Sequence, residues 1–89
     1  MIEEKEESLR RLTCAKLWNR ITKLIGTEDV EVQWDQEKGK YVIWIKYGFF
    51  RRSDVDRISA FFNIEEWHVE EKDWIIWEVL VGTPKEGKI

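Results

Sequence analysis

Residues 74–81, Trp-Ile-Ile-Trp-Glu-Val-Leu-Val, decide the fold of this chain. All positions but one are apolar, so the stretch has no polar face to turn toward water. A strand of this kind needs cover on both sides, which predicts that it lies in the centre of a sheet. Residues 41–47, Tyr-Val-Ile-Trp-Ile-Lys-Tyr, are also apolar on both alternations and predict a second central strand.

The chain outside these strands predicts two helices. Residues 3–25 carry glutamates at the start, basic residues in the second half, and Gly26 as a C-terminal cap. Residues 54–62 follow Ser53, a typical N-cap, and precede Asn63, which suits a left-handed C-cap. The buried stripe of the first helix is expected at three- and four-residue spacing: Cys14, Leu17, Trp18, Ile21, Leu24 and Ile25.

Two further stretches, 29–36 and 66–71, alternate between apolar and charged residues, as half-buried edge strands do. The expected order is therefore helix, hairpin, helix, hairpin. A right-handed crossover between the hairpins leaves a gap in the sheet that strand 74–81 fills. This predicts an α+β fold whose four-stranded antiparallel sheet has the order 66–71, 74–81, 41–47, 29–36 and both helices on one face. Such a fold is a circular permutation of the ferredoxin-like arrangement.

The length of 89 residues predicts a single domain, 1–82, followed by a flexible C-terminal tail, 83–89. Charged residues make up 37% of the chain, yet the net charge is only −3, which argues against a general nucleic-acid or acidic-membrane binder. The abundance of Glu and Lys over Gln, Asn, Cys and Met is typical of thermophiles.

Several features predict a cytoplasmic protein. The N-terminus is rich in glutamate rather than basic and then apolar, so no signal peptide is expected. No apolar run approaches the length of a membrane span. The lone cysteine, Cys14, has no partner for an internal disulfide, which is typical of a reducing compartment.

The sheet face without helices is the expected interaction surface. If Ile75, Trp77 and the next alternating residues face the helices, then Trp74, Ile76 and Leu80 point outward. Which alternation of each central strand faces the helices depends on loop lengths and stays open. Either parity leaves an apolar, aromatic stripe of a size that usually signifies binding. The predicted interface with a second copy or another protein consists of Trp44, Trp74, Ile76, Leu80 and Val42, framed by the acidic residues Glu31, Asp35, Glu66 and Glu70.

Catalytic and metal chemistry are not expected. His68 and Cys14 are far apart in the sequence and lie on different predicted elements, so they form no recognisable nucleophile–base pair. His68 stands between glutamates on an edge strand, where it is expected to be solvated. The chain has no Cys and His spacing typical of a metal site and no glycine-rich phosphate loop, and we expect no cofactor.

Nucleic-acid binding is the alternative function. Trp44 and Trp74 would stack bases on the open sheet, as aromatic residues of RNA-recognition domains do. The basic residues nearest to them are Lys40, Lys46, Arg51 and Arg52. The acidic edges of the sheet oppose this reading, because binding to the phosphate backbone needs positive local charge. The sequence therefore favours a small non-enzymatic protein–protein interaction module, such as an adaptor, inhibitor or accessory protein. Its aromatic sheet face is expected to bind a second copy, forming a homodimer, or another protein.

Overall fold

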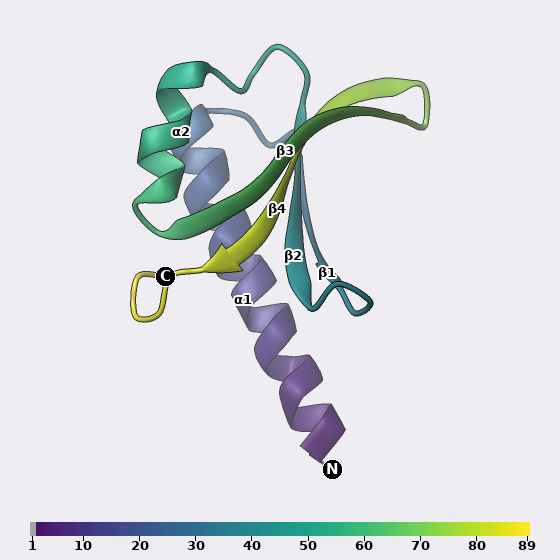
Figure 1. The fold of residues 1–89 in the computed structure, drawn as a ribbon, viewed down its shortest axis with the longest axis vertical. Coiled ribbons are helices and arrows are strands. Elements are labelled where there is room, and N and C mark those ends of the chain that lie inside the picture. The colour runs from purple at the N-terminus through teal and green to yellow at the C-terminus, as the bar shows by residue number, and fades with distance from the viewer. Residues whose placement is uncertain (1) are drawn as a thin grey trace.

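The computed structural model describes the backbone of residues 2–89 and the side chains from residue 4 onward. Residue 1, the first residue of the predicted domain, lies outside the described residues. The chain is an α+β protein with two helices and an open, four-stranded antiparallel sheet, as predicted (Figure 1). Within residues 2–89, no helix combines the length and the apolar character needed to cross a membrane.

The first helix, α1 (Ile2–Ile25), crosses the sheet with its C-terminal half only. Leu17 and Ile21 are fully buried there, whereas Leu9 and Leu12, in the half that projects past the sheet, are exposed. Gly26 ends α1 with a positive φ of 85°, and its N–H donates to Thr22 O at 2.8 Å. The predicted helix and its glycine cap are confirmed.

The sheet has the order β1-β2-β4-β3, which is the predicted one. Its strands are β1 (Val30–Asp35), β2 (Lys40–Lys46), β3 (Phe62–Lys72) and β4 (Ile75–Pro84), and all neighbouring pairs are antiparallel. The two strands that are apolar on both alternations, β2 and β4, occupy the centre. The sheet order thus follows from which strands need cover on both faces.

The second helix, α2 (Arg52–Ser59), is shorter than predicted and begins earlier. Its first turn is closed by Asp54, whose carboxylate accepts the Arg51 N–H at 3.0 Å, and not by Ser53 as predicted. Asn63 is not a helix cap, because Phe62 and Asn63 already belong to β3. The last residues of the predicted helix therefore belong to β3, where they pair with β4.

Strand β3 is bent by an irregularity between Ile64 and Glu66. At this bend the backbone of β4 comes so close that a Cβ on Gly82 would lie 1.7 Å from the Asn63 carbonyl oxygen. Strand β4 continues to Pro84, two residues past the predicted domain boundary. The C-terminus then turns back, so that Arg20 donates to the Lys88 carbonyl and Ile89 packs against the core.

The two faces of the sheet carry two separate apolar clusters. Both helices cover one face, and the core there contains Leu17, Ile21, Val30, Tyr41, Ile43, Ile45, Phe50, Ile58, Phe61, Phe62 and Leu80. The parity of β4 is thereby settled: Leu80 faces the helices and is 0% exposed, and Ile76 lies on the same face, so the expected places of both residues on the open face are wrong. The opposite face carries Val42, Trp77, Val79 and Val81, with Trp44 packed against them.

Candidate functional site

The helix-free face of the sheet is a groove rather than an exposed stripe. Val42, Val79 and Val81 line it, and Trp77 belongs to the same apolar cluster; all four are buried, although no helix covers them. The groove has a volume of about 350 Å³ and is flanked by side chains of both edge strands. Long side chains that bridge this face, Lys72 to Glu31 and Lys38 to Glu66, contribute to the burial of these residues.

Lys72 covers the two tryptophan rings at one end of this face. Its ammonium nitrogen, from β3, lies 4.1 Å from the ring centre of Trp44 and 5.3 Å from that of Trp77. The same nitrogen pairs with the Glu31 carboxylate of β1 at 2.5 Å, so it reaches across the full width of the sheet. Trp44 and Trp77 meet edge to face, with ring centres 6.3 Å apart.

Two further ion pairs join the β1–β2 hairpin to β3. Lys38 lies 3.4 Å from Glu66, and Lys40 lies 3.2 Å from Glu65. His68 is 3.0 Å from Glu70 on the same strand. Most of the acidic residues expected to frame the open face are therefore used inside the chain, as is Lys40.

The structure separates the residues of the predicted interface. Trp44 and Val42 lie in the groove, Leu80 lies in the helix-side core, and Trp74 and Ile76 lie on the β3–β4 hairpin. Trp74 is 95% exposed and follows β3 at the hairpin turn. Trp44 lies opposite Val79, five residues along β4 from Trp74, a strand distance of about 16 Å. The two indoles therefore form no common stacking platform.

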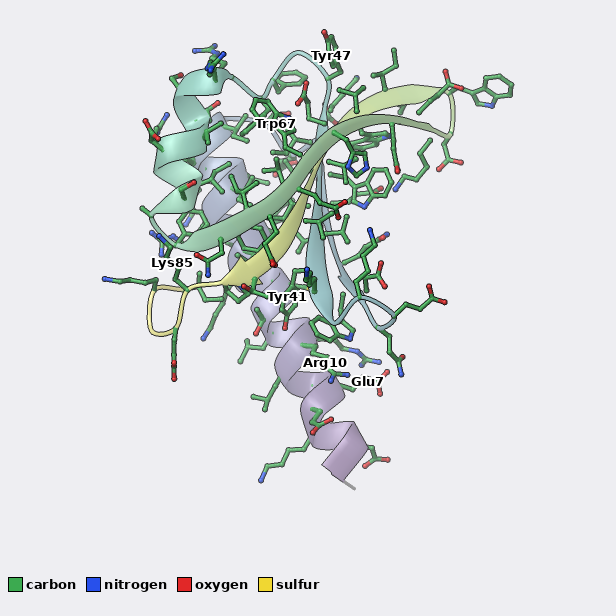
Figure 2. All side chains as sticks on the ribbon, viewed as in Figure 1. Glu7, Arg10, Tyr41, Tyr47, Trp67 and Lys85 are labelled. Atoms are coloured by element: carbon green, nitrogen blue, oxygen red, sulfur yellow. The ribbon has the colours of Figure 1, made fainter. Side chains whose placement is uncertain are left out.

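The β3–β4 hairpin forms an arm that extends past α2 (Figure 1). The arm patch consists of exposed side chains: Tyr47, Trp67, Val69, Trp74 and Ile76. Val69 is opposite Glu78, Glu71 is opposite Ile76, and β2 runs beside β4, so the alternation of the strands places Val69, Ile76 and Tyr47 on the helix-side face. Figure 2 shows Tyr47 and Trp67 where the arm leaves the body of the molecule.

Trp67 anchors the arm patch to the core. Its ring lies edge to face against the buried Phe50, with ring centres 5.2 Å apart. Its indole N–H donates to the Glu78 carboxylate, which is only 9% exposed. A carboxylate so far from water needs this donor, and the pair holds the indole upright on the strand.

The tip of the arm is a two-residue turn of unusual composition. Asp73 and Trp74 both have a positive φ, 53° and 67°. This conformation matches the right-handed twist of a hairpin. It is strained for residues with a large side chain, so glycine or asparagine normally occupies it. A fully exposed tryptophan here costs stability and contributes no packing to the fold.

Sequence reasoning treated Trp67 and Val69 as the inward side of an edge strand and did not single out Tyr47. These exposed residues can be identified by comparing the length of α2 with the length of β3. An eight-residue helix such as α2 is about 12 Å long, whereas the eleven residues of β3 span about 36 Å. Helix α2 therefore covers only the start of β3, and the inward side chains beyond it are left exposed.

A second hollow lies between the projecting half of α1 and the β1–β2 hairpin. Arg10 reaches across it from α1, and its guanidinium lies 4.5 Å from the ring centre of Trp34 (Figure 2). Cys14 lines the same hollow, and burial raises the pKa of its thiol. Cys14 packs against the helix-side core, while His68 lies on the groove side, so the sheet separates the two residues.

Among the described side chains, His, Cys, Asp and Glu form no group of three or more that would hold a metal ion. Comparison of the chain with known protein families, with curated proteins and with solved structures finds no match.

Proposed function

We propose that this chain is a non-enzymatic protein–protein interaction module that binds a second copy of itself through the arm patch. The observation that carries the proposal is the concentration of exposed aromatic and aliphatic side chains on the arm. Contiguous patches of this kind on a small protein mark interaction sites, and tryptophan and tyrosine are the residues that contribute most to binding. Of the interface residues predicted from sequence, the proposal keeps Trp74 and Ile76.

The strained position of Trp74 supports this function. A residue held in a costly backbone conformation at an exposed position is a hypothesis of function, because folding does not explain it. In the isolated chain, the Trp74 side chain contributes no packing that would stabilise the turn. A partner surface that covers the indole offsets the strain.

The charges around the arm favour a protein partner over nucleic acid. Glu70, Glu71 and Asp73 lie beside the tip and repel phosphate. Arg51 and Arg52 lie at the start of α2, Lys40 is paired with Glu65, and Trp44 lies beneath Lys72. A ring of acidic residues around an apolar centre is, by contrast, an ordinary rim for a protein interface.

The test is the mass of the pure protein by sedimentation equilibrium from about 1 µM to 1 mM. We expect a concentration-dependent dimer, with the dissociation constant raised at least tenfold, or about 1.4 kcal/mol, by Trp74→Glu or Ile76→Glu. Leu9→Glu is the matched control, because Leu9 is also exposed but lies on α1, and it should leave the mass unchanged.

A monomer at every concentration would contradict the proposal. Single-stranded oligonucleotides added at low salt provide the other outcome. A monomer that binds them, with tryptophan fluorescence quenched and affinity falling steeply with salt, would establish the nucleic-acid function instead.

We also infer that the fold is a circular permutation of the ferredoxin-like arrangement. The element order αββαββ and the sheet order β1-β2-β4-β3 support this, because moving β4 to the front gives βαββαβ with the ferredoxin-like strand order. A chain that starts at β4, joins its old ends by a short linker and ends at β3 should then fold. Loss of cooperative unfolding in that chain would contradict the inference.

A further inference from the structure

The free edge of β3 presents a defined row of backbone groups. The N–H of Tyr47 donates to Ile76 O at 2.9 Å, so the backbone groups of Ile76 point toward β2. Backbone groups alternate sides along a strand, and those of Ile75 and Trp77 therefore point toward β3.

The β3 residues opposite these β4 residues show which backbone N–H and C=O groups of β3 have no partner in β4. Lys72 is opposite Ile75, Glu70 is opposite Trp77, and His68 is opposite Val79. These β3 residues form the ladder with β4. The residues between them, Trp67, Val69 and Glu71, point their N–H and C=O groups outward.

This edge is open to another strand. In the described part of the chain, the outward groups of Trp67, Val69 and Glu71 have no backbone partner, and their side chains are exposed. The segment 66–72 contains no proline and no bulge, so its protection against pairing rests on its charged side chains, which a matching register can pair with opposite charges. The edge lies on the arm, away from α2, so a second chain has access to it (Figure 1).

A second copy of β3 fits this edge in one register far better than in its neighbours. Antiparallel pairing must join outward groups to outward groups, which allows symmetric registers centred on His68, Val69 or Glu70. Centring on His68 places Glu66 opposite Glu70 and Glu65 opposite Glu71. Centring on Glu70 places the two Glu70 carboxylates face to face. Like charges directly opposite one another are destabilising.

The register centred on Val69 removes these conflicts. It places Val69 opposite Val69, Trp67 opposite Glu71, His68 opposite Glu70, and Glu66 opposite Lys72. Within 66–72 no like charges are opposed; the next pair, Glu65 and Asp73, includes a turn residue that lies outside β3. Because Glu66 and Lys72 already pair with Lys38 and Glu31, the gain from that contact is the absence of repulsion rather than a new ion pair.

We propose that two copies of this chain join edge to edge through β3, antiparallel and centred on Val69, into one continuous eight-stranded sheet. This inference rests on the proposed self-association and specifies how it occurs. The pairing supplies hydrogen bonds to the outward groups of Trp67, Val69 and Glu71 in both copies. It also places the two Val69 side chains opposite one another on the helix-side face, with Trp67 of each copy opposite Glu71 of the other.

Hydrogen exchange of the wild-type protein tests the pairing directly. In dilute monomer, the amides of Trp67, Val69 and Glu71 should exchange freely, while those of His68 and Glu70 are protected by β4. At concentrations where the mass is that of a dimer, we expect the three outward amides to slow at least tenfold. A dimeric sample in which they still exchange freely would overturn edge pairing but leave the proposed self-association standing.

Single cysteines identify the register. In a Cys14→Ala background, Val69→Cys should form a disulfide-linked dimer under mild oxidation, because facing Cα atoms in this register are about 5.5 Å apart. His68→Cys and Glu70→Cys should not, since their own copies would be offset by two residues and about 7–8 Å apart. Efficient crosslinking through His68→Cys or Glu70→Cys instead would contradict the Val69 register. A protein whose mass is that of a monomer at every concentration would instead contradict the proposed self-association itself. That result is distinguishable from a dimer with another register.

Discussion

The ammonium nitrogen of Lys72 lies 4.1 Å from the ring centre of Trp44, two strands away across the helix-free face of the sheet. With Glu31 on the far side, the Lys72 side chain covers the adjacent rings of Trp44 and Trp77. It contributes to the burial of this face, which no third layer covers. The exposed apolar side chains of β3 and β4 lie on the arm, away from this contact.

Lys72→Met should remove the ammonium group from the Trp44 and Trp77 rings while leaving the aliphatic stem in place. We expect a loss of about 1–2 kcal/mol in the free energy of unfolding, mostly from the cation–π contacts, because the ion pair with the half-exposed Glu31 contributes little. Urea unfolding measures the loss, and a red shift of tryptophan emission reports the uncovered rings. Lys46→Met, an exposed lysine on β2, is the control; an equal loss there would contradict the role given to Lys72.

Trp67→Phe should keep the ring on Phe50 but leave the Glu78 carboxylate without its donor. We expect a destabilisation of about 1–3 kcal/mol, measured at a concentration low enough to avoid self-association. Adding Glu78→Leu to Trp67→Phe should recover part of the loss, because no buried charge then remains. A double variant that is less stable than the sum of the two single effects would show that the indole–carboxylate pair is not the cause.

Trp74→Gly should make the monomer more stable by about 1 kcal/mol. Glycine adopts the positive φ of this turn without strain, and Asp-Gly is a preferred pair for such hairpins. The same variant should weaken self-association, since it removes the most exposed residue of the arm patch. Stability is measured by thermal unfolding and association by sedimentation; a Trp74→Gly variant that dimerises as well as the wild type would remove Trp74 from the interface.

Gly82→Ala should prevent the native bend of β3. The added methyl group would overlap the Asn63 carbonyl oxygen, a backbone atom that cannot move without breaking the sheet. We expect a loss of about 4 kcal/mol or more, seen as an insoluble or largely unfolded chain. Gly39→Ala is the matched control: its φ is positive but its surroundings are open, so a loss of only about 1 kcal/mol is expected.

Cys14 should react slowly with alkylating reagents near neutral pH. Burial raises the pKa of its thiol, so less of the reactive thiolate is present than in an unfolded chain. The rate of iodoacetamide labelling, followed by mass spectrometry with and without denaturant, measures the difference. Equal rates in the two conditions would show that the hollow beside α1 gives the thiol no protection.

Most of the architecture was predictable because it depends on local patterns. The long apolar runs in 41–47 and 74–81 placed two strands at the centre of the sheet, and Gly26 marked the end of α1. The errors occurred where a local signal competed with a long-range one. Ser53 and Asn63 resemble helix caps in sequence, but Asp54 closes the first turn and pairing with β4 draws Asn63 into β3.

The sequence by itself determined the class of fold, the strand order and the acidic character of the sheet edges, since these follow from which residues must avoid water. Tertiary structure alone decided which surface is exposed. The parity of β4 hides Leu80 beneath the helices, the reach of Lys72 covers Trp44, and the short α2 leaves Trp67 and Val69 uncovered. Each of these depends on register, curvature or relative length between segments far apart in the chain, and no local pattern encodes them.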